Sequence, residues 1–170
     1  MTDERDPKGW PRAFGERRGL VGALFTVWEN VTPAGMEGGH LRGLFADALT
    51  EAAVLLELPA LAEQASTWRG IAERWAELAE AAVPVSIAEF AWMRGLVSAV
   101  SAGVREGDAG QDAAAAAGDE MWKLREHYND ETPFTDAEAR DLFRTMGTMI
   151  RDIHSAETAA IRELSEALME

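Results

Sequence analysis

The fold is decided by residues 37–84, which read EGGHLRGLFADALTEAAVLLELPALAEQASTWRGIAERWAELAEAAVP. A glycine-broken turn opens this segment, and two stretches rich in Ala, Leu and Glu follow it, a composition that favours helix. Pro59 separates the two stretches, and proline is common at the first position of a helix. The segment therefore predicts two consecutive amphipathic helices.

The apolar residues of both stretches recur at helical spacing. In the first stretch they are Leu41, Leu44, Phe45, Ala48, Ala52, Leu55 and Leu56. In the second stretch they include a seven-residue repeat of Leu61, Trp68, Trp75 and Ala82. We expect both stripes to be buried, and we expect Trp68 and Trp75 to be core residues.

The rest of the chain also has helical periodicity. Ser86–Glu89 and Thr135–Glu138 have the capping-box spacing, in which two side chains satisfy backbone N–H groups at a helix start. Glycines within residues 103–110 and the segment 129–133 interrupt the pattern, and no stretch alternates as a β-strand would. The sequence predicts an all-α, single-domain bundle of about five or six helices. Its residues 1–15 would form a flexible or loosely packed N-terminal segment.

Charge and composition exclude several classes of function. The formal net charge is −14 and the pI is near 4.6, whereas nucleic acids and anionic membrane surfaces bind basic proteins. The chain has no cysteine, which excludes disulfides, thiolate metal sites and a cysteine nucleophile. No apolar run approaches the roughly 18 residues of a membrane span. We expect a cytoplasmic protein that binds neither nucleic acid nor membrane.

The turn at Glu37–His40 is the candidate catalytic site. The helix that follows it starts with free backbone N–H groups, which bind anionic or carbonyl groups. His40 would be the general acid or base, and Arg42 would be a second anchor for the substrate. The amides of Gly38 and Gly39 would bind the substrate as well. The alternative is that the two glycines only form a tight connection between helices.

Aromatic residues predict an apolar, Trp-lined pocket. The chain has six tryptophans, and Trp92 lies beside the apolar stripe of its helix rather than on it. Trp92 is therefore a candidate for a pocket edge or a subunit contact. His127 and Tyr128 would supply polar groups at the pocket mouth. The alternative for these two is an ordinary helix C-terminus, where a histidine is favourable.

A helix-bundle metal site, as in a metal-dependent oxidase, is a further alternative. The metal-capable side chains at helical spacing are His40, Asp47, Glu51, His154 and Glu157. Carboxylate-bridged bundle sites use Glu-x-x-His in two helices, and only Glu37 and His40 have that order here. We therefore predict no metal and no other cofactor.

About half of the chain resembles a known family. The similar parts are EGGHLRGLFADALTEAA (37–53), Leu58–Leu61, Trp68–Arg69, Trp75–Ala79 and Ala156–Ala160. They resemble the C-terminal helical domain of proteins similar to butirosin biosynthesis protein H, in which a Gly-Gly turn precedes a helix of this type. The resemblance implies acyl or aminoacyl transfer from a carrier protein to an amine in natural-product assembly. The nucleophile of that family belongs to an N-terminal papain-like part, which this sequence does not contain.

Two functional hypotheses follow. The first is a natural-product biosynthesis enzyme that holds a small-molecule substrate in a Trp-lined pocket and acts through His40 without a cofactor. The second is a non-catalytic helical module that binds a separate biosynthetic enzyme or a carrier protein. The acidic surface of the chain disfavours an acidic carrier. A homodimer is compatible with both hypotheses.

Overall fold

The computed structural model describes residues 8–32 and 41–169. Its helices are α1 (Trp10–Ala13), α2 (Leu20–Val31), α3 (Leu41–Leu55), α4 (Pro59–Ala82), α5 (Ala88–Arg105), the 3-10 helix η2 (Gly107–Gly110), α6 (Gln111–Asp130) and α7 (Asp136–Ala167). The described residues contain no β-strand, so the predicted all-α class is confirmed. They form seven α-helices, because part of the N-terminal segment that was expected to be loose forms α1. Across these same residues, no helix combines the length and apolarity that crossing a membrane requires.

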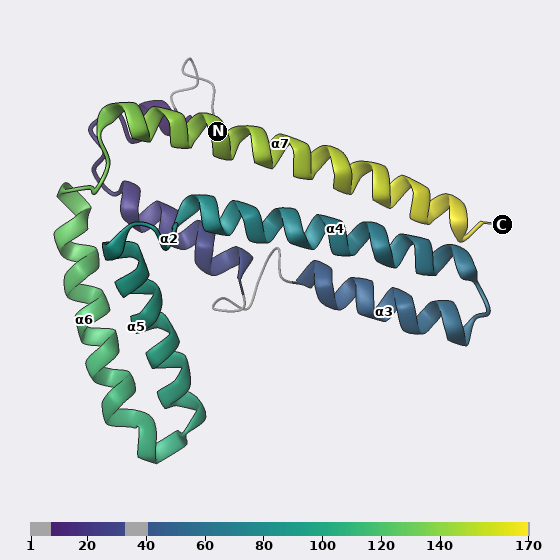
Figure 1. Cartoon of the computed structure of the whole chain (residues 1–170), viewed down its shortest axis with the longest axis horizontal. Coiled ribbons are helices and arrows are strands. Elements are labelled where there is room, and N and C mark those ends of the chain that lie inside the picture. Colours follow the sequence, from purple (N-terminus) through teal and green to yellow (C-terminus); the bar gives the residue numbers. More distant parts are fainter. Residues whose placement is uncertain (1–7, 33–40, 170) are drawn as a thin grey trace.

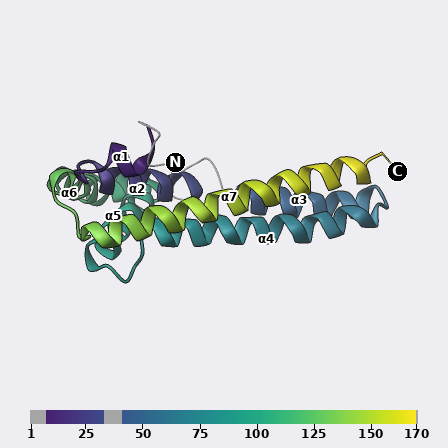
Figure 2. The ribbon, with the colours of Figure 1, turned by 90° about the horizontal axis from the view of Figure 1, so that it is seen from above.

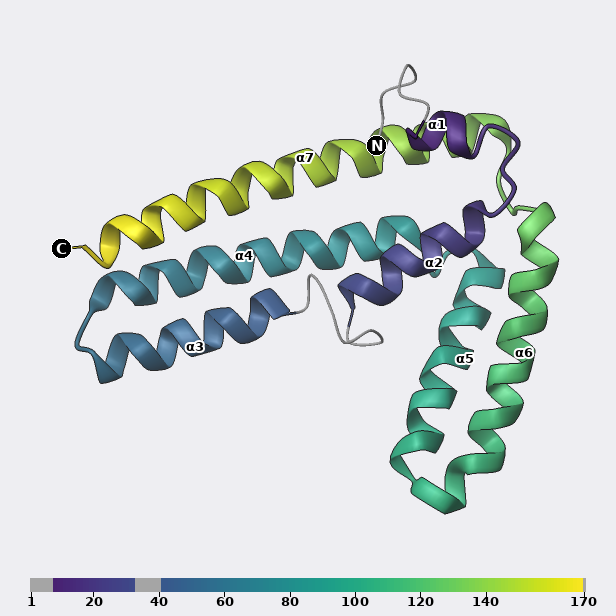
Figure 3. The same ribbon diagram turned by 180° about the vertical axis from the view of Figure 1, so that it is seen from behind.

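The helices are arranged in two arms. The long arm consists of α7, α4 and α3, with α4 packed against both of the others (Figure 1). Seen from above, the three helices still run along one another (Figure 2). The short arm is the hairpin of α5 and α6, which projects from one end of the long arm (Figure 3). The helix α2 lies at the junction, where it packs on α4 and α6.

The described helices form two apolar cores, one at the junction of the arms and one within the long arm. The junction core contains the fully buried Leu24, Phe25, Phe90 and Met146, and the ring centroids of Phe25 and Phe90 are 5.7 Å apart. The core of the long arm is formed by Ala46, Leu49, Ala53, Leu61, Ala65, Trp68, Ile71 and Ala160. Trp68 is only 6% exposed, as predicted for a core residue, and Trp75 is half-buried between the two cores.

The predicted burial of the apolar stripe on α3 is wrong. Leu44 is 62% exposed and Leu55 is 81% exposed, whereas the residues of α3 that are buried are Ala46, Leu49 and Ala53. Among the described helices α3 packs chiefly against α4, and the side that it buries carries Ala46 and Ala53, while its start contacts α7 through Arg42 and Glu157. The stripe with the largest side chains is therefore left in solvent, which is the opposite of the usual orientation of an amphipathic helix.

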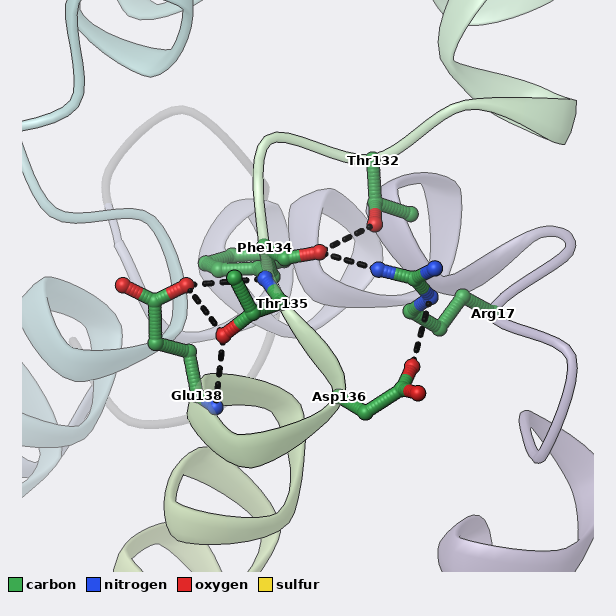
Figure 4. Close-up of polar contacts among 6 residues, drawn as sticks. All are labelled: Arg17, Thr132, Phe134, Thr135, Asp136 and Glu138. Carbon is green, nitrogen blue, oxygen red and sulfur yellow. Dashed lines mark hydrogen bonds and ion pairs between the residues drawn. The ribbon is translucent and has the colours of Figure 1, made fainter.

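The two predicted capping boxes have different outcomes. At the start of α7, Thr135 Oγ1 accepts a hydrogen bond from Glu138 N at 3.3 Å, and Thr135 N donates to Glu138 Oε2 at 2.8 Å (Figure 4). The capping box at Ser86 is absent, because Ile87 N donates to the carbonyl of Pro84 at 3.2 Å in a turn. This turn moves the helix start one residue along, so that Ile87 becomes the N-cap without a side-chain hydrogen bond.

The described part of the N-terminal segment packs against α7. The ring of Trp10 makes edge contacts with Phe14 at 5.3 Å and with Phe143 at 6.1 Å between centroids. Arg17 donates a hydrogen bond to the carbonyl of Phe134 and forms an ion pair of 3.3 Å with Asp136 (Figure 4). Aromatic packing and one arginine thus hold the segment against the start of α7.

Candidate functional site

One polar cluster lies inside the long arm and joins all three of its helices. Glu157 of α7 accepts hydrogen bonds through the same oxygen, Oε1, from Arg42 Nε at 2.8 Å and from Trp75 Nε1 at 2.9 Å. The guanidinium carbon of Arg42 lies 5.7 Å from the centroid of the Trp75 ring, in the range of a cation–π contact. The cluster therefore holds the start of α3 against α4 and α7.

The surroundings of Glu157 keep it ionised. Burial raises the pKa of a carboxyl, but the hydrogen bonds from Arg42 and Trp75 and the positive charges of Arg42 and His154 lower it. The net effect is a pKa below the ordinary value of 4.5. At neutral pH Glu157 is thus a carboxylate paired with Arg42. The predicted substrate anchor Arg42 consequently has a structural partner within the protein.

The centre of the predicted catalytic site lies outside the described residues. Gly38, Gly39 and His40 belong to residues 33–40, which the structure does not describe. Of the four residues predicted to form the site around this turn, only Arg42 lies within the described residues. The proposed roles of His40 and of the glycine amides therefore stay predictions.

The other predicted site residues lie on the short arm. Trp92 of α5 is 60% exposed. His127, in the last turn of α6, approaches Glu131 with 3.7 Å between Nε2 and Oε2, and its ring lies against Tyr128. Tyr128 packs on the junction core, where burial and then the charges of Glu89 and Glu131 raise its pKa. No packing between α3 and these two helices occurs in the described structure, so Arg42 is not brought into contact with them.

Tryptophans line shallow grooves between α2 and the short arm. One groove of about 390 Å³ includes Trp28, Arg94 and Val97, and another of about 290 Å³ includes Val97, Met121 and Trp122. Arg94 stacks on Trp28 at 5.4 Å and forms an ion pair with Glu80 at 2.7 Å. Trp92, the predicted pocket edge, is not among the residues that line these two grooves.

The metal-capable residues are dispersed. Asp47 forms an ion pair with Arg69 at 3.1 Å, and Glu157 is paired with Arg42. Within residues 8–32 and 41–169, no three His, Asp or Glu side chains come together as metal ligands would. Because His40 is outside these ranges, the oxidase alternative is not decided by the structure.

Large apolar side chains are exposed along one side of α3. We call it the α3 face and define it by Leu41, Leu44, Phe45, Ala48 and Leu55, all of them exposed. Glu51 lies on the same side of the helix as Leu44 and Leu55, which precede it by seven and follow it by four positions, and Asp47 borders this side. Sequence periodicity identified this stripe, but periodicity could not show that α3 would turn it away from the core.

Comparison with known proteins gives no relative. No protein-family model, curated protein or solved structure matches this chain.

Proposed function

We propose that this protein is a partner-binding module whose α3 face receives an amphipathic helix of another protein. The observation that supports the proposal is the exposure of large apolar side chains along α3, a helix that packs chiefly against α4 within the described structure. Contiguous apolar patches on protein surfaces commonly mark interaction sites. A helix laid against such a stripe is a known mode of recognition, with apolar anchors at i, i+3, i+4 and i+7.

The amount of exposed apolar surface is sufficient for binding. Complete burial of a leucine side chain contributes about 1.5–3 kcal/mol. Leu44 and Leu55 are more than half exposed and would be the main anchors, with Leu41 and Phe45 as weaker ones. Binding also costs translational and rotational freedom, so an interface of this kind suits a reversible complex of moderate affinity.

The charge of the protein favours a basic partner. The chain carries −14, and Glu51 and Glu57 next to the α3 face have no ion pair with any other residue that the structure describes. A second copy of the chain would bring another −14 to the interface, and like charges disfavour association. We therefore propose a helix with an apolar face flanked by Lys or Arg, carried by a protein other than this one.

Binding of a designed peptide tests this proposal. The probe is a labelled synthetic helix of about 18 residues, long enough to cover α3, with Leu on one face and Lys on the other. We expect it to bind the full chain in fluorescence anisotropy measurements at about 0.15 M salt, where exposed charges are screened. The double variant Leu44→Gln/Leu55→Gln should bind it at least about tenfold more weakly.

Matched controls separate the α3 face from the rest of the surface. Val104→Gln changes another exposed apolar residue, on α5 of the short arm, and should leave the affinity unchanged. The same peptide with Glu in place of Lys should bind more weakly than the Lys peptide. The proposal fails if the double variant binds as well as the wild type. It also fails if the protein alone forms a dimer that Leu44→Gln/Leu55→Gln abolishes, because the occupant is then a second copy.

A biosynthetic enzyme is the second candidate, and one observation favours it. The cluster of Arg42, Trp75 and Glu157 lies at the start of the helix that directly follows His40. This cluster would give the predicted catalytic turn a rigid base. Transfer of an aminoacyl group from a synthetic thioester to an amine is the reaction to assay, and His40→Ala should lower the rate by about 10²–10⁴. The absence of any transfer by the wild-type protein would exclude this candidate.

A further inference from the structure

A pocket of about 440 Å³ lies between α1 and the start of α7. None of the residues that line it belongs to α3. Its volume falls in the range of about 300–1,000 Å³ that small-molecule sites have. The residues that line it are Pro11, Arg12, Phe14, Gly15, Arg17, Asp136, Ala139, Arg140 and Phe143. Three of these nine residues are arginines, and one is acidic.

The arginines of this pocket are incompletely neutralised. Arg17 is engaged by the carbonyl of Phe134 and by Asp136 (Figure 4). Neither the Arg12 nor the Arg140 side chain forms a hydrogen bond or an ion pair with any residue in the described ranges. Three guanidinium groups against one carboxylate leave the lining with a charge of about +2, because arginine stays protonated at neutral pH.

This local excess of positive charge contrasts with the rest of the protein. The chain has 30 acidic and 16 basic residues, and several other arginines are paired with carboxylates: Arg42, Arg69, Arg94, Arg125 and Arg144. Like charges that face one pocket repel one another, and a bound anion removes that repulsion. At the start of α7 the backbone N–H of Glu138 is already used by the Thr135 side chain in the capping box, and the arginine side chains add charged donors to the pocket.

The apolar residues of the lining favour an anion that carries an apolar organic group. Phe143 and Ala139 are buried in the pocket wall, and Phe14 is held by its edge contact with Trp10. A guanidinium group donates paired hydrogen bonds to phosphate oxygens, and a phosphate monoester carries about −1.5 to −2 at neutral pH. We infer that this pocket binds a phosphate monoester, with the phosphate between Arg12, Arg17 and Arg140 and its organic group against Phe14 and Phe143. This inference does not depend on the α3 face.

Titration calorimetry with phenyl phosphate tests the inference on the full chain. We expect one phenyl phosphate to bind per chain. Its affinity should exceed that of inorganic phosphate, which lacks the aromatic group. It should also exceed that of benzoate, which lacks the second negative charge. Arg12→Gln/Arg140→Gln should weaken binding at least about tenfold, the effect of losing charged hydrogen bonds. Arg162→Gln removes one such charge from an exposed position on α7 outside the pocket and should leave the affinity within about twofold.

A measurement without any variant gives a second test. Phenyl phosphate should slow backbone hydrogen exchange in residues 10–17 and 139–143 and leave α3 unchanged. The inference is overturned if phenyl phosphate does not bind, or if inorganic phosphate binds equally well, which would indicate an adventitious ion only. It is also overturned if Arg162→Gln weakens binding as much as the double variant, since the effect is then one of total charge.

Discussion

Arg42 and Glu157, 115 residues apart in the sequence, form an ion pair of 2.8 Å that fastens the start of α3 to the middle of α7. Both side chains are less than one-third exposed, and Trp75 donates to the same carboxylate oxygen. The pair joins α3 to the long arm at its start, while Ala46, Leu49 and Ala53 pack it against α4 further along. Both contacts leave the α3 face in solvent.

Glu157→Gln should destabilise the protein by about 1–3 kcal/mol at neutral pH, because it removes a charged partner of Arg42 at a half-buried site. Urea unfolding followed by circular dichroism measures this difference. Glu166→Gln, on an exposed turn of the same helix, is the matched control and should change the free energy of unfolding by less than about 0.5 kcal/mol.

The contribution of Glu157 should also depend on pH in a defined direction. Its pKa is lowered in the folded protein, so its stabilising effect is complete above the ordinary value of 4.5 and is lost as the pH falls through the folded-state pKa. The difference between the wild type and Glu157→Gln should thus shrink in acid. A difference that grows as the pH falls would contradict the assigned ion pair.

Trp68 and Trp75 should respond differently to replacement by phenylalanine. The Trp68 indole N–H is buried and has no hydrogen-bond partner among residues 8–32 and 41–169, whereas Trp75 donates to Glu157. Trp68→Phe therefore loses packing volume but no hydrogen bond, while Trp75→Phe also leaves Glu157 with one donor fewer. Only Trp75→Phe should raise the pKa of Glu157, which the pH dependence of unfolding detects. Trp68→Ala should cost about 3–5 kcal/mol, as for a core residue.

The two capping sequences allow a paired test. Thr135→Ala removes the side chain that accepts from Glu138 N and should cost about 0.5–2 kcal/mol. Ser86→Ala removes a side chain that makes no cap, and its effect should stay within about 0.5 kcal/mol. Equal losses for the two variants would show that the Ser86 side chain caps α5 as Thr135 caps α7.

Glycines at the crossing of α5 and η2 provide another prediction. A Cβ on Gly103 would lie 2.6 Å from the carbonyl oxygen of Gly110 and 2.9 Å from Ala114 Cβ, so Gly103→Ala forces the hairpin apart. We expect a loss of about 1–3 kcal/mol in thermal or urea unfolding. Gly118→Ala, at a helical position with open space, should instead stabilise the protein by about 0.5–1 kcal/mol. A tolerated Gly103→Ala would mean that the hairpin does not pack this closely.

The helices could be predicted from the sequence because local signals determine them. Pro59 begins α4, and Thr135 begins α7 with its capping box, where the sequence predicts these starts. The capping-box spacing at Ser86 misled because a turn from Pro84 to Ile87 shifts the helix start, and spacing alone does not distinguish the two arrangements.

The candidate site was less accessible to sequence reasoning. Helical spacing finds an apolar stripe but not the element that covers it, so the α3 face was expected in the core. The sequence marks Glu157 as a metal-capable residue near His154 and as part of the segment Ala156–Ala160 that resembles a known family, but not as a partner of Arg42. Its partner Arg42 is 115 positions away, and such a distant pairing has no periodic signal in a single sequence.

Hydrogen exchange of the full chain with and without the Lys-bearing amphipathic peptide tests the central claim most directly. Docking on the α3 face should slow exchange in residues 41–55, because a bound helix opposes local opening, and should leave the hairpin of residues 88–130 unchanged. Protection confined to the hairpin, or bound peptide with no protection anywhere in residues 41–55, would contradict the claim that the α3 face is the binding surface.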